Sequence, residues 1–240
     1  MISHEKYDFL INAIGEIDGV VSIGKSGGKS IPQNNESDID IFVFCNKFPE
    51  AQTRKSAVKK LEFFVSDMKF SEKTGRFWGS CDFMTVEGTE ICLMYFNVAD
   101  MNDEIESILN GSRLDRESEY FYPIGRCASF LSMYILYDET GYISNMQKKL
   151  SVYPLSLAEK LYHHHIHKIN EAEDFERAVL RCDVLFYHAT LELATDHFLQ
   201  ALFALNRCYF PSRKRTSSRI YSRVTSRNIS ALQLPLYKNC

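Results

Sequence analysis

The chain has 240 residues, of which 45% are hydrophobic and 25% charged, the ordinary composition of a folded chain with one large or two small domains. This composition excludes a disordered tail, a collagen-like fibre and a disulfide-stapled miniprotein. The formal net charge of −3 is unevenly distributed: residues 206–240 hold eight Lys or Arg and no acid, a charge of +8, whereas residues 1–205 carry −11. An acidic body with a basic tail predicts chemistry and partners that involve charge.

The sequence predicts a cytoplasmic protein. Residues 1–10 lack the basic start and apolar run of a signal peptide, and no stretch approaches 18 continuous apolar residues, so no membrane span is expected. The cysteines are odd in number, scattered and without a C-x-x-C pair: Cys45, Cys81, Cys92, Cys127, Cys182, Cys208 and Cys240. We therefore expect reduced, buried thiols rather than a metal–thiolate site.

The first half of the chain alternates helical and strand patterns. Apolar spacing predicts a helix over 7–17, a strand over 20–23, a Gly/Ser/Asn-rich loop over 24–37 and a strand over 38–44. A helix is predicted over 49–68, followed by a β-hairpin of 80–86 and 89–96 joined at Glu87-Gly88.

The second half is helical in pattern, over 130–136, 155–169 and 175–205. The predicted fold class is therefore α+β. An N-terminal α/β domain with a mixed sheet is expected over 1–112, and an all-α C-terminal domain over 113–240.

Residues 24–30, Gly-Lys-Ser-Gly-Gly-Lys-Ser, are similar in composition to a P-loop but do not form one. A P-loop has four residues between its first glycine and the Gly-Lys-Ser, whereas Gly24 and Gly28 enclose three. A P-loop also opens directly into a helix, which the following Ile31-Pro32 does not favour.

The strand after this loop carries two carboxylates, Asp38 and Asp40, on one face, because strand side chains alternate. Like charges on one face are unfavourable without a cation between them, and Mg²⁺ takes oxygen ligands together with substrate phosphates. A solvent-exposed strand face is the alternative. The Gly27-Gly28 turn favours the cation, because backbone amides at glycines can approach phosphate oxygens closely.

These residues resemble the DNA polymerase β-like nucleotidyltransferase superfamily, whose signature is a strand, a glycine turn and a strand with Asp-x-Asp. Ser26-Gly27-Gly28 and Ser37-Asp38-Ile39-Asp40 match it, and the second string is typical of the small bacterial branch of aminoglycoside and lincosamide nucleotidyltransferases with a helical C-terminal domain. Residues 137–141 and 204–214 also resemble strings of that branch.

The resemblance implies a third carboxylate, acting as metal ligand or as base towards an acceptor hydroxyl. Glu90 is the first choice, where many relatives have Asp, and Asp82 is the second; Asp100 and Glu104 stay open. The implied catalytic residues and metal ligands are thus Asp38, Asp40 and Glu90. The implied nucleotide-binding residues are Ser26, Gly27, Gly28, Ser37 and Lys214.

The function implied is Mg²⁺-dependent transfer of a nucleoside monophosphate, AMP from ATP in the first instance, to a hydroxyl acceptor. A cationic, antibiotic-like small molecule suits the acidic body. The alternatives are an antitoxin-like transferase acting on protein or tRNA, and a non-catalytic nucleotide- or RNA-binding module. A homodimer is compatible with the sequence.

Two patterns of charged or titratable residues each allow more than one interpretation. One pattern is an arginine at every fourth position, which would lie on one face of a helix: Arg215, Arg219, Arg223 and Arg227. This face could be solvated, could contact pyrophosphate or could bind RNA. His163 and His167 stand one turn apart on a predicted helix, but no Glu completes the H-E-x-x-H zinc pattern, so a polar face or helix packing is favoured. Asp183 and His188 are expected on a helix surface or between domains.

Overall fold

The computed structural model describes residues 3–27, 38–61, 63–71, 75, 77–119, 121–170 and 174–213. The chain forms two compact units: the first comprises 1–106 and 129–152, and the second comprises 107–128 and 153–240. Neither unit is continuous in sequence, and the domain boundary at 112/113 stays a prediction. In the described ranges, no helix combines the length and apolar character needed to cross a bilayer.

The first unit is built on a six-stranded mixed sheet in the order β3-β4-β5-β2-β1-β6. The strands are β1 (Val20–Lys25), β2 (Ile39–Cys45), β3 (Val65–Lys69), β4 (Ser80–Val86), β5 (Thr89–Asn97) and β6 (Tyr134–Asp138). β2 and β5 are parallel, and the other neighbouring pairs are antiparallel. The α+β class and the β4–β5 hairpin are thus confirmed; Glu87 and Gly88 both have positive φ, as a tight two-residue hairpin turn requires.

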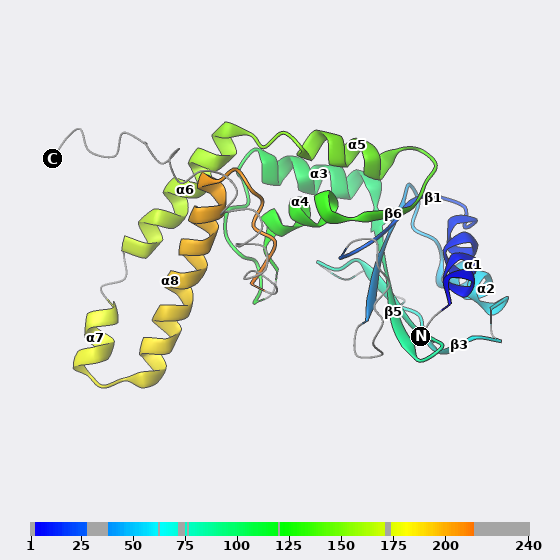
Figure 1. The fold of residues 1–240 in the computed structure, drawn as a ribbon, viewed down its shortest axis with the longest axis horizontal. Helices are drawn as coiled ribbons and strands as arrows, with labels where there is room; N and C mark the ends of the chain where they lie inside the picture. Colours follow the sequence, from blue (N-terminus) through cyan, green and yellow to red (C-terminus); the bar gives the residue numbers. More distant parts are fainter. Residues whose placement is uncertain are drawn as a thin grey trace. The chain divides into compact units, whose positions relative to one another are not determined.

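One face of the sheet is covered by helices α1 (His4–Gly15) and α2 (Ala51–Lys59), as Figure 1 shows. Alternate residues of β2 and β5 point into this layer, where Ile41 and Leu93 are fully buried. Leu10 of α1 and Val58 of α2 belong to the same core cluster. Burial of these side chains, each worth about 1.5–3 kcal/mol, fixes which residues of the strands face the opposite side.

The opposite face carries an aromatic layer. Phe42 and Phe44 of β2 stack with each other and with Phe96 of β5, with ring centroids 5.8–6.5 Å apart. Phe130 and Tyr142, from helices α4 (Pro123–Ser132) and α5 (Tyr142–Leu150), pack against Phe44. This layer covers the ends of β2 and β5, whereas the beginnings of both strands stay exposed at Asp40 and Glu90.

The second unit is mainly helical. Helices α6 (Leu155–Asn170) and α8 (Val184–Leu205) lie side by side, and α7 (Asp174–Leu180) precedes α8 (Figure 1). Helix α3 (Val98–Leu109) follows β5 and leads into this unit. The helix predicted over 155–169 is confirmed.

Three predicted elements differ from the structure. The helix predicted over 49–68 ends at Lys59, and Val65 and Met68 lie in β3 because pairing with β4 outweighs their helical spacing. The helix predicted over 130–136 is wrong: α4 ends at Ser132 and residues 134–138 form β6, paired with β1. The helix over 175–205 is interrupted at Cys182, whose φ is 52°, and Asp183 caps α8.

Candidate functional site

The two aspartates of the motif and Glu90 lie at the beginnings of the adjacent strands β2 and β5. Asp38 directly precedes β2, and Asp40 is paired with Cys92 of the parallel strand β5. Glu90 stands two residues before Cys92, so side-chain alternation places its carboxylate on the face that carries Asp40, while Asp38 stands one residue before the start of β2. All three residues are exposed.

The end of β1 lies next to Asp40. The backbone N–H of Ser26 donates to the carbonyl of Asp40 at 3.0 Å, which continues the β1–β2 ladder by one residue. Gly27 follows with φ of 81°, in the left-handed region that glycine adopts without strain. The structure thus brings Ser26 and Gly27, both exposed, beside the carboxylates. Gly28, Ser37 and Lys214 lie outside the described residues.

Two thiols and an aromatic ring adjoin the carboxylates on the same face, and sequence reasoning missed them. Phe83 of β4 pairs with Cys92, which pairs with Asp40, so these residues form one row across three strands. Phe83 is 39% exposed. The Cys81 and Cys92 thiols share a hydrogen bond, which lowers the pKa of Cys81 and raises that of Cys92. Counting back from the hairpin turn would have placed Phe83 and Glu90 on one face.

Asp82, the second choice for the third carboxylate, faces the other side of the sheet. It is fully buried and forms an ion pair with Arg54 of α2, which is 1% exposed. The Arg54 guanidinium also donates to the carbonyls of Pro49, at 3.2 Å, and Ser71, at 2.6 Å. Burial raises the pKa of Asp82 while Arg54 opposes that shift. The structure therefore does not bring Asp82 to the carboxylates, and its role is to hold α2 on the sheet.

Asp100 and Glu104 lie far from the carboxylates. Both are on α3, beyond the end of β5, whereas Glu90 is at its beginning. The seven steps along the strand from Glu90 to Asn97 span about 23 Å. Asp100 and Glu104 are therefore not brought to the site.

The arrangement at the start of β2 and β5 fits a divalent cation of the Mg²⁺ type. Adjacent strands are about 4.8 Å apart, and residues i and i+2 on one strand are about 6.6 Å apart, so flexible carboxylates on this grid can converge on one or two ions. Mg²⁺ prefers oxygen ligands and keeps waters, which exposed carboxylates permit. The neighbouring Ser26 hydroxyl and Gly27 amide are donors suited to an anionic group.

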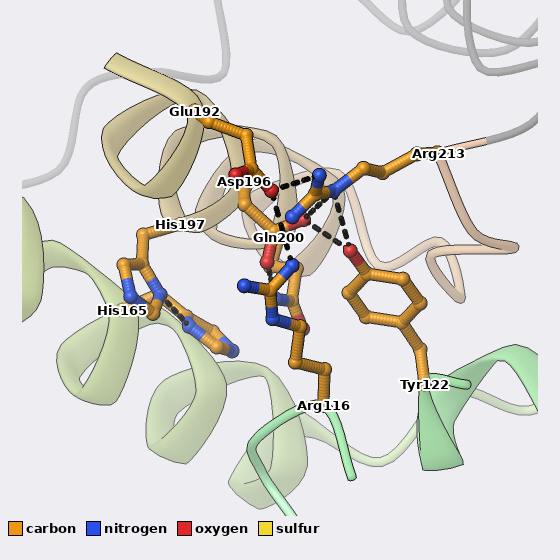
Figure 2. A network of polar contacts seen from close by, with 8 residues as sticks. All are labelled: Arg116, Tyr122, His165, Glu192, Asp196, His197, Gln200 and Arg213. Atoms are coloured by element: carbon orange, nitrogen blue, oxygen red, sulfur yellow. Dashed lines mark hydrogen bonds and ion pairs between the residues drawn. The ribbon is translucent and has the colours of Figure 1, made fainter. Parts of the chain in front are cut away.

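The basic segment after α8 is described as far as Arg213, which belongs to a polar network within the second unit (Figure 2). Its Nε donates to Asp196 at 3.0 Å and to the Tyr122 hydroxyl at 2.8 Å, and it forms an ion pair with Glu192. Burial opposes its charge, but the hydrogen bonds to Asp196 and Glu192 outweigh burial and raise the Arg213 pKa. Within this unit Arg213 is therefore a structural arginine. The four-residue arginine repeat at 215–227 lies outside the described residues.

Comparisons with known proteins are sparse. Residues 125–215 match a family model described as a domain of unknown function, DUF4037. The comparison with curated proteins gave no match. Among solved structures, the chain is similar to the crystal structure of a nucleotidyltransferase-like protein from Exiguobacterium sibiricum, at 9% identity and a TM-score of 0.40. The similarity covers 95% of this chain and 66% of that one, so the chain spans less than two thirds of that protein's length.

Proposed function

We propose that the protein is a nucleotidyltransferase that transfers a nucleoside monophosphate, AMP from ATP in the first instance, to a hydroxyl group of an acceptor. The observation that carries the proposal is the exposure of Asp40 and Glu90 on one face of the adjacent strands β2 and β5, with the exposed Asp38 one residue before β2. The glycine turn at Ser26-Gly27, hydrogen-bonded to the Asp40 backbone, supplies the second half of the motif.

Each residue has a distinct role in this proposal. Asp38 and Asp40 would hold Mg²⁺, and Glu90 would complete the ligand set or accept the proton of the acceptor hydroxyl. Bound Mg²⁺ supplies charge neutralisation on the attacking and leaving oxygens of phosphoryl transfer. The Ser26 hydroxyl and the Gly27 amide would donate to phosphate oxygens, with Gly28, Ser37 and Lys214 as further proposed contacts.

Phe83 adds a surface for an aromatic or sugar ring. Its exposed ring lies in the same cross-strand row as Asp40, on the face that carries the carboxylates. Base–aromatic stacking contributes about 1–3 kcal/mol and does not depend on which base is bound. Phe83 therefore suits a nucleobase or a ring of the acceptor.

The acceptor proposed first is a small, cationic molecule of the antibiotic type, attracted by the exposed carboxylates at the beginnings of β2 and β5. A transferase acting on protein or tRNA is the second candidate, favoured by the excess of basic residues after position 205. A module that binds nucleotide or RNA without catalysis would not require three exposed carboxylates at the beginnings of β2 and β5, because like charges there cost stability.

The test measures Mg²⁺-dependent nucleotide binding and transfer in the full chain. Calorimetry with a non-hydrolysable ATP analogue, with and without Mg²⁺, reports binding without the need for an acceptor. Labelled ATP with aminoglycosides, lincosamides, tRNA and protein candidates reports transfer and pyrophosphate release. The test variant is Asp38→Asn/Asp40→Asn; the control is Asp67→Asn on β3, exposed with φ of 51°, which asparagine tolerates.

We expect the double variant to lose Mg²⁺-dependent binding and transfer, and Asp67→Asn to retain both. Glu90→Gln should keep nucleotide binding but lower transfer by about 10²–10⁴-fold if Glu90 acts as the base. Transfer that survives in the double variant would refute the carboxylate mechanism. Mg²⁺-dependent binding with no pyrophosphate release from any acceptor would support the non-catalytic module instead.

A further inference from the structure

The histidine-rich turn of α6 holds a cluster that the proposed function does not use. Four histidines occur within residues 163–167, and the structure separates them by burial: His163 and His167 are exposed, His164 is half-buried and His165 is fully buried. The buried histidine points towards α8, where its Nδ1 lies 3.0 Å from Nδ1 of His197 (Figure 2). The sequence had drawn attention to the pair His163 and His167, which face solvent instead.

Two side chains, Asp115 and His164, gather beside this buried ring. One ligand atom each of Asp115, His164 and His165 lies within 4.8 Å of the others. His164 Nε2 is 2.9 Å from Asp115 Oδ1, close to the separation of about 3.4 Å between two ligands of a tetrahedral zinc ion. Asp115 comes from the segment between α3 and α4, so the cluster joins that segment to α6 within the second unit.

His165 supplies the observation that points to a ligand. Its Nδ1 is engaged with His197, and its Nε2 is buried without a hydrogen-bond partner among the described residues. A buried ring nitrogen without a partner is costly, and metal coordination would satisfy it. Histidines that bind metals commonly use the second ring nitrogen in a hydrogen bond that fixes the ring, and His197 provides that hydrogen bond.

We infer that Asp115, His164 and His165 form a binding site for a transition-metal dication of the Zn²⁺ class, with His197 orienting His165. Two imidazoles and one carboxylate are a ligand set for Zn²⁺ that leaves the fourth position to water. The hard Mg²⁺ ion prefers an all-oxygen set, so this site would be selective against the ion proposed at Asp38 and Asp40.

A dication at this cluster would replace the proton that His164 Nε2 now donates to Asp115 Oδ1. With Nδ1 donating to His197, Nε2 of His165 is the ring nitrogen left to coordinate a dication. Burial opposes ionisation of Asp115, but hydrogen bonds from Lys168 and His164 outweigh it and lower its pKa. Lys168 Nζ lies 2.5 Å from Asp115 Oδ1 and would compete with the incoming dication.

The experiment uses the full chain without a polyhistidine tag, after treatment with chelator. Zn²⁺ binding is measured by competition with a chromophoric chelator, and Co²⁺ serves as the spectroscopic probe of ligand type. Asp115→Asn and His164→Gln remove partly exposed ligands and leave the buried His165 in place. His163→Gln and His167→Gln are matched controls on the same turn of α6. Circular dichroism checks that each variant is folded.

We expect one Zn²⁺ per chain, a thermal midpoint that rises on Zn²⁺ addition, and a Co²⁺ spectrum of nitrogen and oxygen ligation. Asp115→Asn and His164→Gln should weaken binding at least about tenfold, while the controls bind like the wild type. Lys168→Gln should bind more tightly, because a competing charge is removed. The readouts need no nucleotide, so they stand or fall separately from the proposed transferase activity.

Four results would overturn the inference. The first is the absence of stoichiometric Zn²⁺ binding by the wild-type chain. The second is equal loss of binding in His163→Gln or His167→Gln. The third is an intense sulfur-to-cobalt charge-transfer band, which would place the ion on the cysteines. Weaker binding by Lys168→Gln would contradict the placement of the ion at Asp115.

Discussion

The buried ion pair between Arg54 and Asp82 gives the sharpest prediction about the first unit. The perturbations are Arg54→Met, Asp82→Leu and the double variant, which together form a thermodynamic cycle. Both side chains are almost wholly inaccessible, at 1% and 0% exposure. The Arg54 guanidinium also lies 5.1 Å from the ring centroids of Phe48 and Tyr95, so it has aromatic as well as ionic contacts.

The expected loss of unfolding free energy depends on the buried group that each single variant leaves without its partner. Removing one partner strands a buried charge, which costs about 3–5 kcal/mol of unfolding free energy. Asp82→Leu would in addition leave the Ser71 N–H without the acceptor it has at 3.0 Å. Replacing both partners by apolar groups removes the stranded charge, so the double variant should lose less than the two single losses combined. We expect a coupling free energy of about 3 kcal/mol.

The assay is equilibrium urea unfolding of the full chain at pH 7, followed by circular dichroism. Because domains are stable by only about 5–15 kcal/mol, Asp82→Asn is added as a milder variant that keeps an oxygen acceptor for Ser71. Additivity of the two single variants within about 0.5 kcal/mol would refute the account of the pair. Folded Asp82→Asn should bind Mg²⁺-nucleotide like the wild type; loss of that binding would place Asp82 in the site after all.

Three further substitutions test other parts of the fold by urea unfolding. Burial opposes ionisation of Asp138, but hydrogen bonds from the start of α5 and from β1 outweigh it and lower its pKa. Its ionised form therefore stabilises the fold above its unfolded-state pKa, and the loss caused by Asp138→Asn should shrink as the pH falls from 7 to about 3. Tyr122→Phe removes a buried hydroxyl that donates to Asp196 and should cost about 1–2 kcal/mol at pH 7. Gly125→Ala places a Cβ 2.5 Å from the carbonyl oxygen of Pro211 and should cost about 1–3 kcal/mol, whereas an unchanged midpoint would show that the two segments do not pack.

The parts of the fold predicted from the sequence are those in which one local period dominates. β2 alternates Ile39, Ile41 and Val43 with polar or aromatic positions, and the hairpin has a turn dipeptide between two alternating runs, so both strands could be predicted from period two. Residues 134–138 alternate weakly, and they are a strand because β1 offers them an unpaired edge. Such pairing joins residues more than a hundred positions apart, which a local pattern does not contain.

In the candidate site, too, a local sequence pattern predicts some features and not others. Asp38 and Asp40 could be chosen because they stand two residues apart at the start of one predicted strand, and Glu90 because its position after them resembles a known motif. The choice between Glu90 and Asp82 depended on the hairpin register. With the turn at 87–88, Glu90 pairs with Thr85 and Asp82 pairs with Leu93, so the two acids must face opposite sides. The sequence contained this information, but the burial of Asp82 against α2 did not follow from it.

The net charge of a segment predicts its ligand less well than the pairing of each individual charge does. The −11 of residues 1–205 includes carboxylates such as Asp82 and Asp196, each buried and paired with an arginine from a distant part of the chain. These acids contribute to the total but not to an attractive surface, since their charge is compensated at hydrogen-bond distance. Arg213 is likewise one of the eight basic residues in the +8 segment, but its charge is paired with Glu192 and Asp196 inside the second unit. The carboxylates that can attract a cation are exposed ones, so the proposed cation site depends on the face of β2 and β5 and not on the overall charge.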